Sequence, residues 1–273
     1  MRLRKFHRAK DMIMKNITRL IFGITFSLVM IAAKAQSAKN LNIVFIGNSI
    51  TYGANLAHPE TDAPPVIVAK YWAQKVPIGA IAFSNQGHSG YTTLDFLPHT
   101  AAFASAETAA RAFSDKNAPL IFSIDLGTND SAIKGPNGAP VKPEDYRANL
   151  KAITDALLKD FPGCLVVIHH PIWYSPNTYN GAMYLQEGLS RLQTYFPEID
   201  SLVADYRKSQ RKRVFVGDVV AFDYFKTNYL TDLTPENGHQ GTFYLHPNKK
   251  GAIALGNYWG AAIYKLVKRM GKN

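Results

Sequence analysis

The chain has 273 residues, of which 47% are hydrophobic and 19% charged, and this composition excludes an intrinsically disordered protein. The formal net charge is +11, but residues 1–35 contain eight Lys and Arg against one Asp, so about four net positive charges remain in residues 36–273. Those residues show no stripe of Lys and Arg interleaved with aromatic side chains that would follow a phosphate backbone. We therefore expect no nucleic-acid partner.

The first 35 residues have the pattern of a signal peptide. A basic segment precedes an apolar run over residues 20–33, and Ala33-Lys34-Ala35 forms an A-x-A cleavage signal. The apolar run has about 14 residues, fewer than the roughly 20 that span a bilayer as a helix. We expect a signal peptide at 1–35, export to the periplasm or the medium, and no stable membrane insertion after cleavage. Residues 36–273 then have the size of one domain.

Short apolar runs alternate with amphipathic segments along the rest of the chain, which indicates a parallel α/β sheet with strands buried on both faces. The expected strands are 42–46, 81–84, 120–125, 165–169 and 214–216. The expected helices are 65–75, 101–112, 144–161, 182–195 and 249–269. The segment 222–245, rich in Thr, Asn, Gly and Pro, is expected to be a long irregular loop. The single cysteine, Cys164, is expected to be a buried structural thiol.

Ligands of an open parallel sheet bind beyond the carboxyl ends of its strands, so the residues after each apolar run are candidates for a site. Gly47 after the first run permits a tight turn, which places Ser49 at the start of a helix with its backbone N–H available to an oxyanion. A nucleophile and a helix N-cap are both open roles for this serine. Gly90 ends a glycine-containing loop after the second run. The glycines allow a backbone N–H to approach a ligand closely, and the alternative is that the loop is only a turn.

Two further candidates follow later in the chain. Asn129, after the third run, offers a side-chain amide to an oxyanion, with Asp130 beside it to hold the loop; an Asx turn is the alternative. His246 stands directly before the last helix, where its imidazole can take a proton from a serine hydroxyl near neutral pH. Together with Ser49 and Gly90, these residues supply a nucleophile, a base and three oxyanion donors at loops expected on one edge of the sheet.

This set of four blocks resembles that of the SGNH hydrolases, also called the GDSL esterase and lipase family, over residues 42 to about 256. The resemblance implies a flavodoxin-like three-layer α/β/α sandwich with a five-stranded parallel sheet of order 2-1-3-4-5. It also implies that Ser49 is the nucleophile and His246 the general base. The oxyanion hole would consist of the N–H of Ser49, the N–H of Gly90 and the side chain of Asn129. Neither a metal nor an organic cofactor is implied.

Two positions depart from the family pattern. Asn48 stands where the family often has Asp, and this short polar side chain still suits the turn. Phe243 stands where the family usually has an Asp, three residues before the catalytic histidine, so the usual orienting carboxylate is missing. A backbone carbonyl or an acid of the preceding loop would then orient His246. The candidate acids are Asp223, Asp232 and Glu236.

The loop after the fourth strand, residues 169–180, combines aromatic and polar side chains. The rings of Trp173 and Tyr174 suit the face of a sugar or, equally, the edge of the core, while His169 and His170 lack the carboxylate partner of a metal site. The expected export and the aromatic residues of this loop together favour an esterase that removes O-acetyl groups from a small-molecule or oligosaccharide ester. The alternatives are a lipid or lysophospholipid acyl esterase, although residues 53–65 show no long apolar lid, and a catalytically weak carbohydrate-binding protein on the same scaffold.

Overall fold

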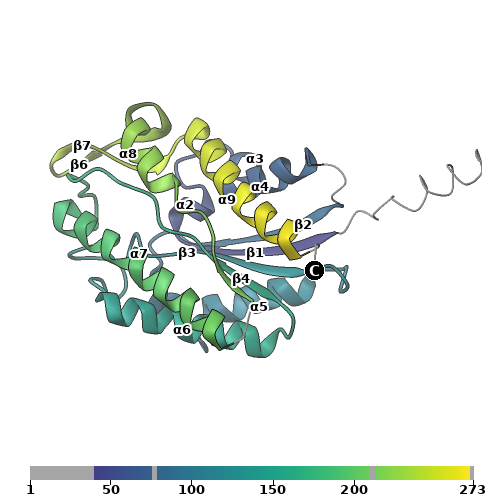
Figure 1. The fold of residues 1–273 in the computed structure, drawn as a ribbon. Helices are drawn as coiled ribbons and strands as arrows, with labels where there is room; N and C mark the ends of the chain where they lie inside the picture. The colour runs from purple at the N-terminus through teal and green to yellow at the C-terminus, as the bar shows by residue number, and fades with distance from the viewer. Residues whose placement is uncertain (1–39, 76–78, 210–212, 271–273) are drawn as a thin grey trace, which may run out of the picture. The chain divides into compact units, whose positions relative to one another are not determined.

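A computed structural model describes residues 40–75, 79–209 and 213–270. Within these ranges, five parallel strands form one sheet in the order β2-β1-β3-β4-β5 (Figure 1). The strands are β1 (Leu41–Gly47), β2 (Ile81–Gly87), β3 (Leu120–Asp125), β4 (Leu165–Ile168) and β5 (Val214–Val216). The expected strand order 2-1-3-4-5 is confirmed. The expected signal peptide at 1–35 lies outside the described residues.

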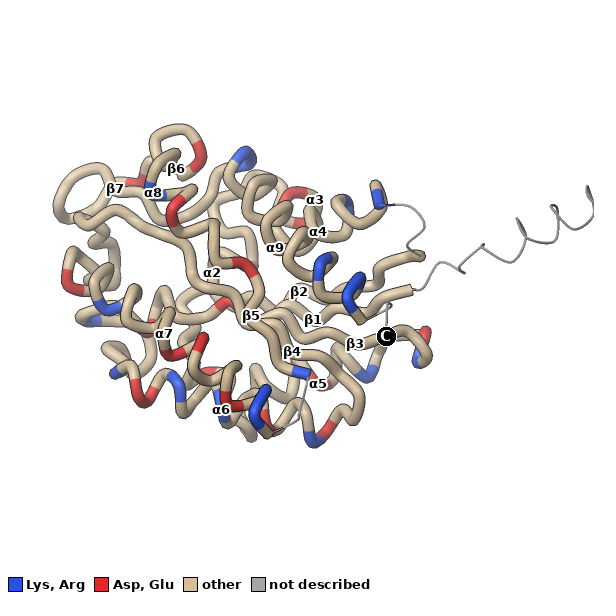
Figure 2. Tube along the Cα trace, viewed as in Figure 1, with Lys and Arg blue, Asp and Glu red and all other residues tan. Residues whose placement is uncertain are grey.

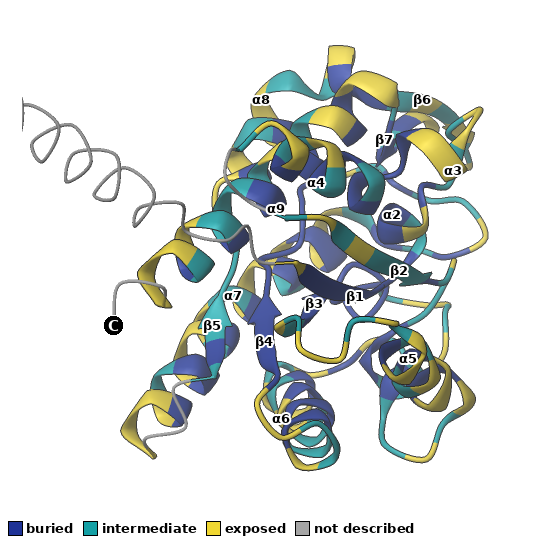
Figure 3. Ribbon diagram, turned by 90° about the vertical axis from the view of Figure 1, so that its right-hand side faces the viewer, coloured by how far each residue is buried: buried dark blue, intermediate teal, exposed yellow. Residues whose placement is uncertain are grey.

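Helices cover both faces of this sheet and make three layers (Figure 3). α4 (Pro64–Ala73) and α9 (Lys249–Met270) pack against each other on one face, while α5 (Ala101–Ala112), α6 (Pro143–Asp160) and α7 (Leu185–Lys208) cover the other. Because the sheet is covered on both sides, a strand such as β1 is buried at every residue, and its sequence is apolar except for Asn42. The three-layer α/β/α sandwich is therefore confirmed.

The sequence of α6 shows how local signals and burial agree. Pro143 occupies the first turn, where its missing N–H is not needed, and acidic residues in that turn suit the positive end of the helix dipole. Tyr146, Leu150, Ile153 and Leu157 repeat at helical spacing, and all four are fully buried. Burial of each such side chain contributes about 1.5–3 kcal/mol, so this stripe attaches the helix to the sheet.

The segment 222–245 is not the irregular loop that its composition indicated. α8 (Ala221–Asp232) leads directly into β6 (Leu233–Gly238), which pairs antiparallel with β7 (Gly241–Pro247). This hairpin is separate from the parallel sheet (Figure 1). β6 has the sequence Leu-Thr-Pro-Glu-Asn-Gly, in which Pro235 cannot donate to a ladder and no apolar run occurs, so the sequence contains only a weak strand pattern here.

α7 also differs from the expected helix over 182–195. It begins at Leu185 and continues to Lys208 through Pro197, a residue that removes one backbone hydrogen bond and usually ends or kinks a helix. The helix continues because its later turns bury another apolar stripe. The buried residues after the proline are Ile199, Leu202, Val203 and Tyr206.

Charged residues of both signs are interspersed along α6 and α7 (Figure 2). Arg147 of α6 pairs with two acids of α7, at 3.6 Å from Glu198 and 2.6 Å from Asp205, and so links the two helices. Exposed pairs of this kind contribute at most about 1 kcal/mol each. No helix in the described ranges is long and apolar enough to cross a bilayer.

Candidate active site

Ser49 begins the short helix α2 (Ser49–Tyr52) at the carboxyl end of β1. Gly47 allows the turn, because a Cβ on this residue would lie 1.9 Å from Oγ1 and 2.6 Å from Cβ of Thr51. The helix is capped by Asn48, whose Oδ1 accepts the backbone N–H two residues further on at 2.9 Å. Since Asn48 is the N-cap, the hydroxyl of Ser49 is left for another partner.

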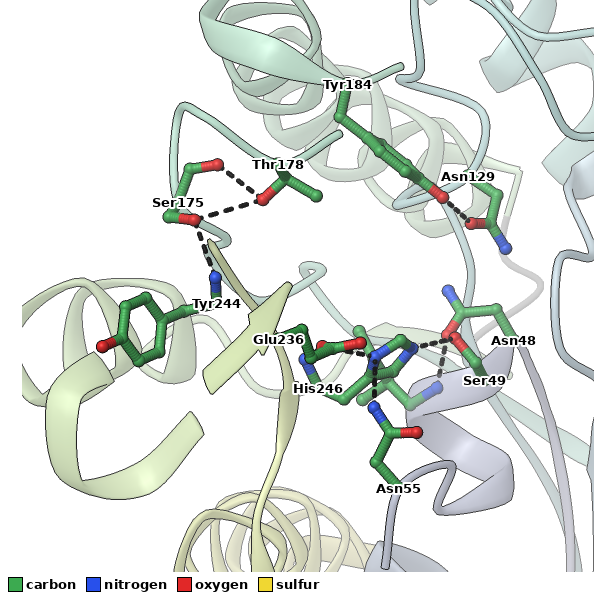
Figure 4. Close-up of polar contacts among 11 residues, drawn as sticks. Asn48, Ser49, Asn55, Asn129, Ser175, Thr178, Tyr184, Glu236, Tyr244 and His246 are labelled. Carbon is green, nitrogen blue, oxygen red and sulfur yellow. Dashed lines mark hydrogen bonds and ion pairs between the residues drawn. The ribbon is translucent and has the colours of Figure 1, made fainter. Parts of the chain in front are cut away.

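That partner is His246 in β7, whose ring lies between Ser49 and Glu236 (Figure 4). Nε2 is 2.9 Å from Oγ of Ser49, and Nδ1 is 2.8 Å from Oε1 of Glu236. The same carboxylate oxygen accepts the backbone N–H of His246 at 3.3 Å. The side chains of His246 and Glu236 are only 11% and 18% exposed, so water competes weakly with this charge-assisted bond.

This geometry selects one tautomer of His246. A carboxylate only accepts hydrogen bonds, so Nδ1 carries the hydrogen and donates it to Glu236, which leaves Nε2 to accept the hydroxyl hydrogen of Ser49. The amide nitrogen of Asn55 also lies 3.2 Å from Nδ1 and could donate to it only in the other tautomer. The bond to the ionised acceptor is the stronger one, so the array favours the tautomer that can take the Ser49 proton.

The other acids considered from the sequence serve elsewhere. Asp232 is fully buried at the end of α8, where it accepts Nζ of Lys250 at 2.7 Å and the hydroxyl of Tyr224 at 2.6 Å. Asp223 is exposed in the first turn of α8. In the described part of the chain neither carboxylate contacts His246.

Gly90 and Asn129 border the same pocket as Ser49. Gly90 has a φ of +81°, in the left-handed region where glycine is unstrained, and has no side chain to cover its N–H. Asn129 follows β3: its Nδ2 donates to the carbonyl of Tyr91 at 2.8 Å, and its Oδ1 accepts the hydroxyl of Tyr184 at 2.7 Å. One N–H of the amide thus remains for a ligand, and Figure 4 shows the amide nitrogen on the side facing Ser49.

Asp130 holds the loop that carries Asn129. Its fully buried Oδ1 accepts the backbone N–H of Thr93 at 2.9 Å and the hydroxyl of the same residue at 2.5 Å. Burial raises the pKa of Asp130 to about 6, although the two bonds from Thr93 act in the opposite direction. The loops after β2 and β3 are therefore joined directly beside the site.

The pocket has a volume of about 480 Å³ and brings all four candidate residues together. The other residues that line it are Ala54, Asn55, Ser89, Gly135, Pro136, Asn180, Gly181, Ala182, Tyr184 and Leu245. Among these described lining residues none is Lys, Arg, Asp or Glu. The wall facing a ligand is therefore neutral, with amide and hydroxyl groups beside small apolar ones.

A model of the GDSL-like lipase/acylhydrolase family matches residues 45–253, which include every candidate residue named above. The chain belongs to the GDSL-like lipase/acylhydrolase family. It is therefore an ester hydrolase of the GDSL type, and the family resemblance noted in the sequence is confirmed. No curated protein sequence matches the chain.

Solved structures show the same GDSL hydrolase fold. A carbohydrate acetylesterase from Sinorhizobium meliloti superposes with a TM-score of 0.56 at 16% identity, covering 83% of this chain and 99% of that one. A lipase/acylhydrolase from Enterococcus faecalis has a TM-score of 0.55 at 18% identity, with 84% and 96% covered. A two-domain esterase active on acetylated mannans has a TM-score of 0.51 at 18% identity, with 89% and 52% covered. At these identities the likeness concerns the fold alone.

In this GDSL hydrolase, the aromatic rings of the loop after β4 do not form an exposed surface for a sugar. Trp173 is 6% exposed and Tyr174 is fully buried, so both rings cover the edge of the core. Tyr174 donates its hydroxyl to Ser131, 2.9 Å away, since that serine donates its own hydrogen to a backbone carbonyl. Of the two interpretations open in the sequence, the structural one is correct for these rings.

His169 and His170 point to different partners. Nδ1 of His169 accepts the backbone N–H of Asp218 at 2.9 Å and its ring stacks on Trp259, while the ring of His170 stacks on Phe196. Burial lowers the pKa of His169 to about 3, so this imidazole stays neutral. Across residues 40–75, 79–209 and 213–270, no three His, Cys, Asp or Glu side chains gather closely enough to hold a metal ion.

Proposed function

We propose that the protein is a serine esterase in which Ser49 is the nucleophile, His246 the general base and Glu236 the acid that orients the base. The array that supports this proposal is the pair of contacts from the His246 ring, 2.9 Å to the Ser49 hydroxyl and 2.8 Å to the Glu236 carboxylate. It has the roles of a Ser-His-acid triad, which is recognised by geometry and not by position in the sequence.

The reaction is acyl transfer in two halves. Oγ of Ser49 attacks the ester carbonyl carbon while its proton passes to Nε2 of His246, and the negative oxygen is stabilised by the N–H of Ser49, the N–H of Gly90 and the amide of Asn129. Collapse of this intermediate breaks the ester bond, and the leaving alcohol takes the proton from Nε2. Water then gives a proton to Nε2 and attacks the acyl-enzyme carbonyl. Collapse of the second intermediate breaks the bond to Oγ of Ser49, which takes the proton back from Nε2 as the acid is released. Each proton transfer uses a group of this chain, and no metal or organic cofactor takes part.

The substrate we propose is a short acyl ester, most simply an O-acetyl group, on a neutral carbohydrate. The pocket is small and its described lining is uncharged, so a phosphate or carboxylate on the substrate would find no counter-ion there. Asn55, Ser89 and Asn180 offer amides and a hydroxyl that match sugar hydroxyl groups. The likeness to an acetylesterase of carbohydrates and to an esterase of acetylated mannans agrees with this choice. Export under the signal peptide expected at 1–35 belongs to the same proposal.

A lipid acyl esterase is the rival within the enzyme class, because the family includes lipases and one neighbour is named a lipase/acylhydrolase. The amide-rich wall of the pocket favours a polar alcohol over a long acyl chain. The third alternative, a binding protein without catalysis, depended on the missing orienting acid. With Glu236 at 2.8 Å from His246, the reason for that alternative is gone.

The test compares the protein with its Ser49→Ala variant on p-nitrophenyl acetate, butyrate and octanoate. Ser190→Ala, an exposed serine on α7, is the matched control. We expect Ser49→Ala to lower kcat by a factor on the order of 10⁴ to 10⁶ and the control to retain full activity. The acetate should be hydrolysed faster than the octanoate. Equal rates for Ser49→Ala and the unchanged protein would refute the proposed nucleophile, and preference for the octanoate would favour the lipid esterase.

A further inference from the structure

The side chain of Asn129 is held at both of its polar ends. A backbone carbonyl only accepts hydrogen bonds, so the contact with the Tyr91 carbonyl identifies the Nδ2 end of the amide, and Oδ1 then faces the hydroxyl of Tyr184. Asn129 is 3% exposed, which leaves little room for water to replace either partner. The direction of the remaining amide N–H is therefore set by these two contacts.

Tyr184 is itself held in place by its backbone. It lies at the N-cap position of α7 and is 3% exposed. The carbonyl of Thr178 accepts the backbone N–H of Tyr184 at 3.2 Å and that of Leu185 at 3.1 Å. Leu185 has a φ of +53°, an unfavourable conformation for a leucine that persists only where surrounding contacts hold it. The ring of Tyr184 is thus presented by a turn with little freedom.

The same turn connects to the strand that carries the base (Figure 4). The hydroxyl of Thr178 donates to the carbonyl of Ser175 at 2.6 Å. Ser175 donates its backbone N–H to the carbonyl of Tyr244 at 2.8 Å, and its hydroxyl oxygen accepts the N–H of Tyr244 at 2.8 Å. Tyr244 lies in β7, two residues before His246. Hydrogen bonds between successive residues, joined through the residues themselves, therefore link the strand of the base to the amide of Asn129.

We propose that Tyr184 is a positioning residue, which directs the amide N–H of Asn129 at the oxyanion formed on Ser49. The inference rests on the proposed esterase function and adds to it a residue that acts through Asn129 without touching the reacting atoms. An oxyanion donor works only when it is already aimed at the developing charge, and small misplacements of catalytic groups lower the rate strongly. Without the hydroxyl of Tyr184, Oδ1 of Asn129 loses its partner and the amide can rotate.

A pH dependence separates this role from proton transfer. Burial raises the pKa of Tyr184 well above its usual value, so the hydroxyl remains a donor throughout the range in which an esterase is assayed. Loss of the hydroxyl should then lower the rate by the same factor at every pH. The shape of the pH profile for kcat should be unchanged in Tyr184→Phe.

The experiment compares Tyr184→Phe with Tyr174→Phe on p-nitrophenyl acetate. Tyr174 is an equally buried neighbour, with ring centroids 5.4 Å apart, whose hydroxyl binds Ser131 and not Asn129. We expect Tyr184→Phe to lower kcat by about 10-fold with KM changed less than about twofold, and Tyr174→Phe to change kcat less than about twofold. Titration of active sites with a serine-directed phosphonate counts only folded enzyme, so a loss of folded protein is not read as a loss of rate. An equal fall in both variants, or a change only in KM, would overturn the proposal.

A double-mutant cycle between Tyr184 and Asn129 tests independently whether Tyr184 acts through Asn129. Asn129→Ala should lower kcat by about 100- to 1,000-fold, and adding Tyr184→Phe should then change it less than about twofold. If the two losses multiply, Tyr184 does not act through Asn129 and the proposal is wrong. Failure of the proposed function would look different, because Ser49→Ala would then retain the activity of the unchanged protein.

Discussion

Glu236 and Phe243 are direct partners across the β6–β7 ladder. Side chains that face each other in an antiparallel pair lie on the same side of the hairpin, so a carboxylate at 236 reaches the space beside position 243. Phe243 is 1% exposed and packs into the core, while Glu236 contacts Nδ1 of His246 at 2.8 Å. In the proposed triad, the opposite strand therefore supplies the acid that the family usually places three residues before the histidine.

The first prediction concerns this carboxylate. Glu236→Ala removes the acceptor for Nδ1, and Glu236→Gln allows an amide N–H to favour the wrong tautomer of His246. We expect both variants to lower kcat by about 100-fold or more, up to the roughly 10⁴-fold seen when the acid of a triad becomes an amide. Steady-state rates on p-nitrophenyl acetate measure this effect.

Asp223→Ala is the control for Glu236, because Asp223 is the exposed acid of the same region. Its kcat should stay within about twofold of the unchanged protein. A loss in Asp223→Ala that matches the loss in Glu236→Ala would contradict the assignment of the orienting acid.

The second prediction concerns recognition of the alcohol part of the substrate. Oδ1 of Asn180 accepts the backbone N–H of Ala182 at 2.9 Å, which leaves its Nδ2 available in the pocket wall. Asn180→Ala should lower kcat/KM for an acetylated sugar by about 2- to 13-fold, the value of one hydrogen bond to a neutral group, and change p-nitrophenyl acetate hydrolysis much less. The ratio of the two specificity constants is the measurement.

Asn177 offers a matched comparison on the same loop. Its Nδ2 already donates to the carbonyl of Thr242 at 2.8 Å and so has a structural role. Asn177→Ala should leave the ratio of the two specificity constants unchanged. If both asparagine variants shift the ratio equally, Asn180 has no particular role in binding the sugar.

The third prediction concerns the stability of the fold as a function of pH. Burial, and secondarily the charge of Asp218, raises the pKa of Asp125 to about 8 from its ordinary value of 3.8. The unfolded chain releases the Asp125 proton near pH 4, whereas the folded state keeps it until about pH 8. Between these two pH values the folded state binds one proton more than the unfolded state, so the contribution of Asp125 to stability falls as pH rises. Asp125→Asn has no proton to lose at this position.

Thermal unfolding of both proteins at several pH values tests this dependence. Tm of Asp125→Asn minus Tm of the unchanged protein should increase steadily from pH 5 to pH 8 and level off above it. A difference that is constant with pH, or that decreases, would show that Asp125 does not hold its proton in the folded state.

The fourth prediction separates stability from catalysis. Burial by itself would raise the pKa of Asp232, but hydrogen bonds led by that from Lys250 outweigh it and hold the pKa below its usual value. Since the folded pKa is lowered, this carboxylate stabilises the fold above about pH 4, and the contribution is lost as pH falls through the folded pKa. Asp232→Ala leaves the partners of a buried carboxylate unpaired, which should cost about 2–3 kcal/mol and lower Tm by roughly 5–10 °C at pH 7. Calorimetry checks the shift, and kcat at 25 °C should stay near that of the unchanged protein, in contrast to Glu236→Ala.

The local pattern of the sequence determined the sheet and the positions of the candidate blocks. Strands buried on both faces need continuous apolar runs, and helices such as α6 carry their start signals and apolar stripes within one segment. Gly47 stands where a Cβ would collide with Thr51, and Gly90 has a positive φ that favours glycine. Such features depend on neighbours a few residues away, so they can be predicted without the fold.

The tertiary structure alone decided how the side chains of the site meet. Glu236 is ten residues from His246, and only the register of a short hairpin selects it over Asp223 and Asp232. The same is true of Tyr184, which is 55 residues from Asn129, and of Trp173, whose ring turns into the core. These contacts depend on where distant segments pack, and the local sequence holds no signal for the distance between them.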